Sequence, residues 1–351
     1  MNEEASTLPR RVAILDPLRG VAALAVMWFH LTNGGGLFAD PSLLSRGFKA
    51  SGHYGWAGVE MFFVISGFVL PYALDRGGYR LRDYGTFWLK RLLRLEPPYL
   101  ASIALALLLW ALGSLAPAYQ GVPFTIEVRR LLLHLGYLNH YFGAESYNPV
   151  YWTLAIELQF YLSIALLFPL LAARRTLVRL AVPLAFLALT WVPVEGVFLF
   201  KYLPLFLLGI LAYQVHARCL SRPEHGLLSG LALLAAGFRL GLAATLAGAL
   251  AASCITLFAT QGAAPSLERR LWMKALSWAG TVSYSLYLVH VPVGGRVINF
   301  GARAANHGAT RVGVLLAAIA ASLLAAWALN RIVERPSQRL SAGRRFREAQ
   351  P

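Results

Sequence analysis

The chain has 351 residues, of which 58% are hydrophobic and only 14% are charged. Water-soluble domains carry about 25% charged residues, so most side chains of this chain cannot face water. The composition excludes a soluble globular enzyme, a disordered chain and a disulfide scaffold, and it predicts an all-α integral membrane protein. The formal net charge of +16 is typical of basic loops retained on the cytoplasmic side of a membrane, so we expect no nucleic acid partner. The two cysteines, Cys219 and Cys254, form no metal-ligand cluster, and we expect no metal.

About ten segments are predicted to be transmembrane helices, because a helix needs about 20 mostly apolar residues to cross a bilayer core. They lie near residues 13–31, 55–74, 97–116, 150–172, 177–194, 197–215, 227–241, 243–260, 277–296 and 311–332. The stretch 126–142 mixes charged residues with leucines and is better explained as an amphipathic or re-entrant helix. We therefore predict one membrane-spanning domain over residues 1–340, followed by a basic cytoplasmic tail at 341–351.

The distribution of basic residues predicts the orientation of these helices. With the N-terminus inside, the predicted cytoplasmic segments hold more than twice as many of the 32 Lys and Arg residues as the opposite segments. Cytoplasmic loops are enriched in Lys and Arg. The count therefore favours an even number of spans with both termini cytoplasmic.

The first predicted span contains three ionisable residues, Asp16, Arg19 and His30. An ionisable group inside a membrane is a functional candidate by default. Arg19 and His30 are eleven residues apart, which places them within about 20° of one helix face and about 16 Å apart. Asp16 can pair with Arg19 across one turn. The alternative is that Asp16 and Arg19 extend to the inner interface, while His30 caps the outer end.

The second predicted span has polar points at Glu60 and Ser66, and glycines at Gly58 and Gly67. Small residues allow helices in membranes to approach closely. Packing alone would explain the glycines and Ser66, so both interpretations stay open here.

The next segment carries Arg91 and Arg94 on one face of a helix that we expect to end before Pro97 and Pro98. Two guanidinium groups on one face form a clamp suited to phosphate, because each presents a planar fork of donors. The alternative role is that of a positively charged anchor on the cytoplasmic side.

Polar groups also lie inside two later spans. Glu157 is too deep in its apolar helix to be explained by packing, so it should pair with a cation such as Arg19 or Lys201, or be protonated. In the ninth predicted span, Ser283 and His290 are seven residues apart and lie on nearly one face. His290 alone is explained as a hydrogen-bonded structural histidine.

Together these residues resemble the acyltransferase-3 family of integral membrane acyltransferases. The resemblance runs from about residue 15 to 291 in the order expected for the family. It rests on five motifs: Arg19 and His30 separated by ten residues, the glycine- and phenylalanine-rich stretch Gly58 to Phe68, the pair Arg91 and Arg94, Trp152 to Glu157, and Tyr284 to His290. The sequence shows no counterpart of the soluble esterase-like domain of some members, so it resembles the stand-alone type.

The resemblance implies transfer of an acyl group, usually acetyl, from cytoplasmic acetyl-CoA to a hydroxyl group of a sugar. Acceptors in the family include exopolysaccharide, O-antigen, nodulation-factor and macrolide sugars, so the acceptor here would be a polysaccharide, a lipid-linked saccharide or a glycoside. Acyl-CoA would act as a donor substrate, with no permanently bound cofactor. The implied location is a cell membrane, as a multi-pass protein of the bacterial inner membrane.

The resemblance also suggests roles for individual residues. His30 would act as general base on the acceptor hydroxyl, or as a nucleophile that forms an acyl-imidazole. Arg19 would orient substrate, and Glu157 would orient His30 or a substrate hydroxyl. The remaining candidates would bind the donor phosphates or the developing oxyanion. The phosphate ligands would be Arg91 and Arg94, and the substrate or oxyanion candidates are Ser66, Tyr287 and His290.

The predicted topology places Arg91 and Arg94 at the cytoplasmic side and His30 near the opposite end of its helix. A donor held by its phosphates would have to extend its thioester arm through a channel towards His30. Two other classes of protein compete with this hypothesis. A proton-coupled transporter or flippase would also bury Arg, His and Glu, although no inverted repeat is evident. A membrane scaffold or sensor would need neither a phosphate clamp nor a buried His and Glu.

Overall fold

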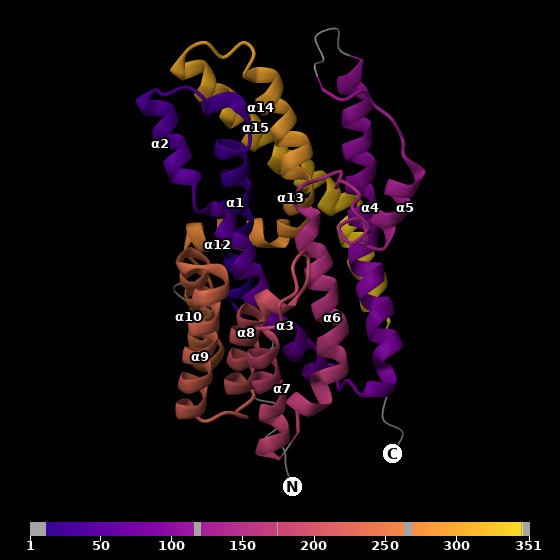
Figure 1. Cartoon of the computed structure of the whole chain (residues 1–351), viewed down its shortest axis with the longest axis vertical. Helices are drawn as coiled ribbons and strands as arrows, with labels where there is room; N and C mark the ends of the chain where they lie inside the picture. Colours follow the sequence, from indigo (N-terminus) through magenta and orange to yellow (C-terminus); the bar gives the residue numbers. More distant parts are fainter. Residues whose placement is uncertain (1–11, 116–120, 174, 263–268, 345, 347–351) are drawn as a thin grey trace.

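In this computed structural model, every regular element among the described residues, 12–115, 121–173, 175–262, 269–344 and 346, is helical (Figure 1). The all-α prediction is confirmed for this part of the chain. The longer helices are α1 (Leu15–Asn33), α3 (Gly58–Arg76), α4 (Tyr84–Ser114), α6 (Tyr151–Leu171), α7 (Thr176–Leu189), α8 (Leu203–His216), α9 (Arg222–Leu240), α10 (Leu242–Gln261) and α15 (Gly308–Leu329).

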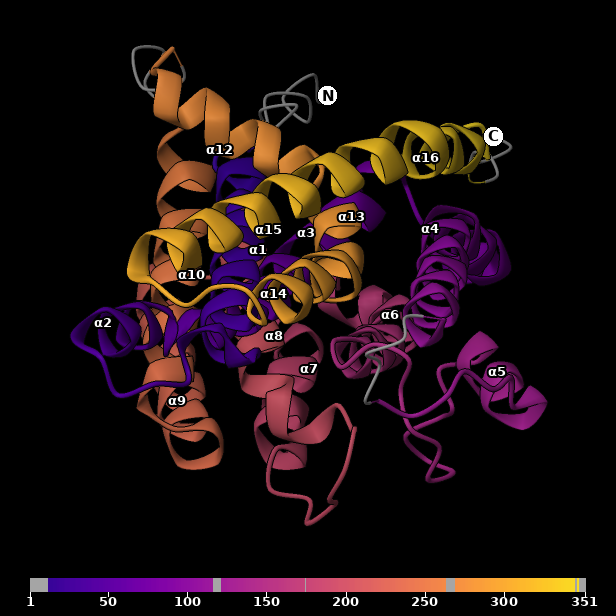
Figure 2. The same cartoon turned by 90° about the horizontal axis from the view of Figure 1, so that it is seen from above.

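Shorter helices connect or extend these elements. They are α2 (Leu43–Gly52), α5 (Val128–Leu135), α12 (Leu271–Thr281), α13 (Ser283–Val289), α14 (Arg296–Gly301) and α16 (Arg335–Ala342). Two π-helical segments, η6 (His290–Gly295) and η7 (Asn330–Glu334), join α13 to α14 and α15 to α16. Seen from above, α15 and α16 form one long diagonal across the molecule (Figure 2).

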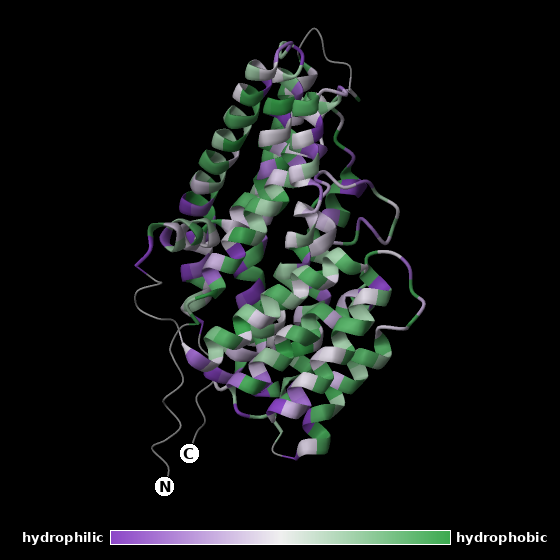
Figure 3. Ribbon diagram, turned by 90° about the vertical axis from the view of Figure 1, so that its left-hand side faces the viewer, coloured by the Kyte–Doolittle hydropathy of each residue, from purple (hydrophilic) through white to green (hydrophobic). Residues whose placement is uncertain are grey.

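Among the described residues, five helical stretches are long and apolar enough to cross a membrane. These are Leu43–Arg76, Leu81–Ser114, Tyr151–Leu171, Leu242–Gln261 and Gly308–Ala342. Hydrophobic residues predominate along the helices (Figure 3). The ten predicted spans all fall largely on helices; that all ten cross the membrane, with both termini cytoplasmic, stays a prediction. Within the stretch 126–142 the structure has only the eight-residue helix α5, which is too short to cross.

Glycines set the distance between α3 and α8 near the centre of the bundle. A Cβ atom on Gly67 would lie 2.1 Å from the carbonyl oxygen of Phe206, and one on Gly209 would lie 2.0 Å from that of Val64. Any other residue would push the two backbones apart. The close helix approach predicted for Gly67 is therefore confirmed, and it places α3 firmly against the almost wholly buried α8.

The prediction that the helix of Arg91 and Arg94 ends before the two prolines is wrong. Helix α4 continues through Pro97 and Pro98 as one 31-residue element. Proline removes a backbone donor, but membrane helices tolerate it where neighbouring groups satisfy the freed carbonyls. Next to the prolines, the Tyr284 hydroxyl donates a hydrogen bond to the Leu95 carbonyl at 2.9 Å, which ties α13 to this part of α4. A single helix therefore links the arginine pair to the outer half of α4.

Candidate active site

A cavity of about 280 Å³ lies where α1, α3, α4, α6 and α13 meet. We call it the arginine cavity. It brings together six of the residues predicted from sequence: Arg19, Ser66, Arg91, Arg94, Glu157 and Tyr287. The other two predicted site residues, His30 and His290, do not line it.

Asp16 and Arg19 form the predicted pair, with 3.5 Å between Arg19 Nη1 and Asp16 Oδ1. Both residues line the arginine cavity. The polar face at the start of α1 is therefore directed into the protein, where it is available to a ligand.

Arg91 is held mainly by aromatic rings. Its guanidinium carbon lies 5.3 Å from the ring centroid of Phe87 and 5.2 Å from that of Tyr161. Neither Arg91 nor Arg94 donates a hydrogen bond to any described residue. Cation–π contacts fix a guanidinium without consuming its N–H donors. The donors of both arginines therefore remain free for an anion, as the phosphate-clamp prediction requires.

Glu157 accepts a hydrogen bond from the Ser66 hydroxyl at 2.7 Å. It shares the cavity with Arg19 but makes no ion pair with Arg19 or Lys201 in the described part of the chain, where Lys201 instead lies 4.8 Å from the ring centroid of Tyr202. The expected direct ion pair is thus not formed, and the partner of the carboxyl group is instead the Ser66 hydroxyl. The alternative, a protonated Glu157, stays a prediction. No hydrogen bond joins Glu157 to His30, so a role in orienting that imidazole stays a prediction.

The two histidines lie side by side. The ring centroids of His30 and His290 are 5.2 Å apart, and the ring of Tyr287 lies 5.9 Å from that of His290. His290 is fully buried, and its Nδ1 contacts the Leu286 carbonyl at 2.9 Å, as predicted for a hydrogen-bonded histidine. Its Nε2 is buried with no partner among the described residues. The Tyr287, His290 and His30 rings thus form a row that starts at the arginine cavity.

Residues Ser283–Val289 form α13, and the helix changes from α to π at His290. That Ser283 and His290 share a face of the helix stays a prediction. Ser283 lines the arginine cavity, whereas His290 does not.

His30 lines a second, larger depression of about 1090 Å³, which we call the His30 groove. It lies between α1, the last turns of α4, and the segment from η6 to α14. The lining residues used below are His30, Leu109, Leu112, Asn148, Arg296, Phe300 and Arg303. The two depressions share none of their lining residues, and the row of rings lies between them.

The two proposed oxyanion donors already have hydrogen-bond partners. Ser66 donates to Glu157. The Tyr287 hydroxyl lies 2.8 Å from the Thr153 hydroxyl and 3.2 Å from the Val150 carbonyl. Each hydroxyl would have to break an existing hydrogen bond before it could donate to an oxyanion. The role of Ser66 and Tyr287 as oxyanion donors therefore stays a prediction.

Sequence reasoning missed two residues of the cavity. Glu334 in η7 is buried, accepts hydrogen bonds from Ser285 at 2.6 Å and from Asn330 at 2.8 Å, and lines the arginine cavity. Tyr161 supplies a ring to Arg91. The only sequence signal for Glu334 was its acidic side chain among the basic residues after the last predicted span. No motif indicated Tyr161.

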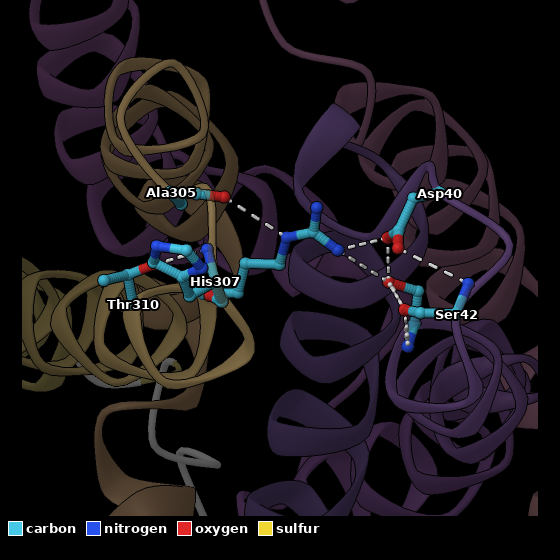
Figure 4. A network of polar contacts seen from close by, with 7 residues as sticks. Asp40, Ser42, Ala305, His307 and Thr310 are labelled. Atoms are coloured by element: carbon cyan, nitrogen blue, oxygen red, sulfur yellow. Dashed lines mark hydrogen bonds and ion pairs between the residues drawn. The ribbon is translucent and has the colours of Figure 1, made fainter.

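A polar network ties α2 to the start of α15 (Figure 4). Asp40 accepts hydrogen bonds from the Ser45 hydroxyl and from Arg311, and Arg311 also donates to the Ala305 carbonyl at 3.3 Å. Hydrogen bonds from Ser45 and Ser42, followed by the positive charge of Arg311, lower the pKa of Asp40 to about 2. We call this network the Asp40 clasp.

Among the described residues, no group of three or more His, Cys, Asp or Glu side chains is arranged to hold a metal ion, and the expected absence of a metal stays a prediction. The arginine cavity has instead the donor set of an anion site.

Residues 12–331 match the acyltransferase-3 family, described as an acyltransferase domain. The chain belongs to the acyltransferase-3 family. Together with the apolar helices, this membership makes it a multi-pass membrane protein. It also favours a transferase over the transporter and scaffold alternatives.

Individual relatives resemble the chain over part of its length. The O-acetyltransferase OatA of Staphylococcus aureus (strain NCTC 8325 / PS 47) is 32% identical over 169 residues, which cover 46% of this chain and 25% of the relative. A putative O-acetyltransferase, SACOL0978 of S. aureus (strain COL), is 28% identical over 44% of this chain and 24% of its own length. A putative acetyltransferase, ORF330 of Acidianus two-tailed virus, is 30% identical over 57% and 56%. The match thus spans only about a quarter of the staphylococcal proteins, and no solved structure matches.

Proposed function

We propose that the chain is a membrane O-acetyltransferase that moves an acetyl group from cytoplasmic acetyl-CoA to a sugar hydroxyl, in a bacterial inner membrane. The observation that carries the proposal is the convergence of Arg19, Arg91 and Arg94 on one cavity, with a row of rings from its wall to His30. Family membership and the names of the relatives support the reaction type.

The arginine cavity suits the phosphates of the donor, because Arg91 and Arg94 keep their N–H donors free. Phosphates are strong acceptors for planar guanidinium forks. The acyl end of the donor would then extend towards the row of Tyr287, His290 and His30. In this arrangement the donor phosphates lie at the arginine end of the site, and the donor thioester lies at the histidine end.

His30 is the proposed general base. The acceptor hydroxyl oxygen attacks the thioester carbonyl carbon, forming the new C–O bond, while an imidazole nitrogen of His30 takes the hydroxyl proton. Collapse of the tetrahedral intermediate breaks the C–S bond, and the proton passes from His30 to the departing sulfur of CoA. His290, whose ring lies 5.2 Å from His30, would keep the imidazole in position by packing.

The test uses the purified full chain in lipid nanodiscs with acetyl-CoA, following release of CoA by a thiol reagent. We expect slow hydrolysis of acetyl-CoA that is lost in His30→Ala. The matched control is His225→Ala, because His225 lies on α9 and lines a separate depression, where its Nε2 atom lies 3.4 Å from the Ser229 hydroxyl. Equal CoA release by wild type and His30→Ala would refute the assignment of the base.

A further inference from the structure

The walls of the His30 groove are apolar and reach the outside of the bundle. Leu109 and Leu112 line it from α4, and Phe300 lines it from α14. Leu112 is 56% exposed and Phe300 is 77% exposed. Leu112 belongs to one of the five membrane-crossing stretches. Burial of apolar surface is favourable, so these exposed walls suit an occupant that carries a hydrocarbon chain.

The charged part of the groove has one sign. Arg296 and Arg303 line it, and no Asp or Glu does. Neither arginine forms a hydrogen bond or an ion pair with any residue that the structure describes. Arg296 is the first residue of α14, and Arg303 lies in the turn that follows the last residue of this helix, Gly301. Both side chains line the same groove, so one ligand in the groove can meet both. Two unpaired guanidinium groups beside an apolar wall match an amphipathic anion, and phosphate is the anion that suits their geometry.

We propose that the His30 groove binds the acceptor as a sugar carried on a lipid phosphate. The hydrocarbon chain would lie along Leu109, Leu112 and Phe300, with the phosphate on Arg296 and Arg303. The sugar would then extend inward to His30, which lines the same groove. This inference rests on the proposed function for the role of His30 and goes beyond it by naming how the acceptor is presented.

Other occupants match the groove less well. A water-soluble polysaccharide has no hydrocarbon chain to bury the exposed apolar walls formed by Leu112 and Phe300. An ordinary anionic phospholipid would satisfy the walls and the arginines, but it brings no sugar hydroxyl to His30. A sugar carried on a lipid phosphate contacts all three parts of the groove: the apolar walls, the two arginines and His30.

Binding is measured on the purified full chain in zwitterionic nanodiscs, without acetyl-CoA. The probes are hexadecyl phosphate and hexadecanol, which share one chain and differ only in the phosphate. Each is titrated against intrinsic tryptophan fluorescence. We expect the phosphate to bind about tenfold or more tightly, because its contacts with arginine are charge-assisted hydrogen bonds. Equal binding of the two probes would overturn the proposal.

The variant pair is Arg296→Gln with Arg303→Gln, and the matched control is Arg46→Gln, an exposed arginine on α2 that does not line the groove. The double variant should lose the advantage of the phosphate probe while its affinity for hexadecanol and its unfolding midpoint stay unchanged, and the control should behave as wild type. Wild-type affinity in the double variant would refute the proposal. So would displacement of a hexadecyl-phosphate-linked glucose by equimolar phosphatidylglycerol, because the groove would then be a phospholipid site.

This readout separates the two proposals. Binding requires no acetyl-CoA, so CoA release that depends on His30 without phosphate-selective binding removes only the acceptor inference. Phosphate-selective binding without CoA release removes the proposed function and leaves a lipid-phosphate site.

Discussion

Substitution of Gly67 by Ala tests the packing that places Ser66 beside Glu157. The added Cβ atom would lie 2.1 Å from the carbonyl oxygen of Phe206, whereas ordinary contacts begin at 3.4 Å. Helices α3 and α8 must therefore separate by about 1 Å, since the obstacle is backbone that cannot rotate away. Overpacking of this kind costs about 1–3 kcal/mol.

The control is Gly230→Ala on α9, where no atom lies within 4 Å of the added Cβ. Replacing a helical glycine with alanine at an open site stabilises by about 0.5–1 kcal/mol. Thermal unfolding of the purified chain in detergent measures both variants. At roughly 2 °C per kcal/mol for a large chain, Gly67→Ala should lower the midpoint by several degrees, and Gly230→Ala should leave it unchanged or slightly higher.

The same variant should also lose activity, because Ser66 is the neighbour of Gly67 and its hydrogen bond to Glu157 spans α3 and α6. We expect CoA release to fall in Gly67→Ala at temperatures well below its unfolding midpoint, and to stay normal in Gly230→Ala. If Gly67→Ala unfolds at the wild-type temperature with wild-type turnover, the contact between α3 and α8 described above is wrong.

Three further predictions follow from single side chains. Arg94→Gln should raise the KM for acetyl-CoA about tenfold or more with a smaller change in kcat, since a hydrogen bond to a charged group contributes about 1.5–3 kcal/mol; steady-state CoA release measures this, and an unchanged KM would argue against the phosphate clamp. Ser66→Ala should lower kcat about tenfold by freeing the Glu157 carboxylate, and equal turnover would show that this hydrogen bond has no part in the reaction. Because the pKa of Asp40 falls from about 3.9 when unfolded to about 2 when folded, the clasp stabilises the fold above about pH 4 and is lost as the pH falls towards 2. Unfolding midpoints between pH 5 and 2 should therefore fall more steeply for wild type than for Asp40→Asn, and parallel curves would contradict this.

The sequence predicted the helices and most of the cavity well, because both depend on local rules. Apolar runs of sufficient length are helices, and ionisable residues within them must find interior partners. Arg19 and Glu157 were predicted from the cost of an ionisable group in a membrane, and Arg91 from its position beside Arg94 on one helix face. The three residues lie on different helices and all line one cavity.

Features that depend on contacts between distant segments could not be predicted. Beside its prolines, α4 is bound by Tyr284, which lies 189 residues along the chain from the Leu95 carbonyl that accepts its hydrogen bond. The π-helical turn at His290 cannot be deduced from a regular spacing of side chains. Glu334 is held at the cavity by hydrogen bonds from Ser285 and Asn330. The sequence around Glu334 contains no motif that predicts this position.

The length of α1 bears on the acyl donor of the proposed function. Arg19 lines one depression and His30 lines the other, and eleven residues of helix separate their backbones by about 16 Å. Under the proposed function, the donor must be long enough for its phosphates to lie in the arginine cavity while its activated carbonyl reaches His30. Acetyl phosphate, whose acyl carbon is bonded to its own phosphate through one oxygen, is too short to do both.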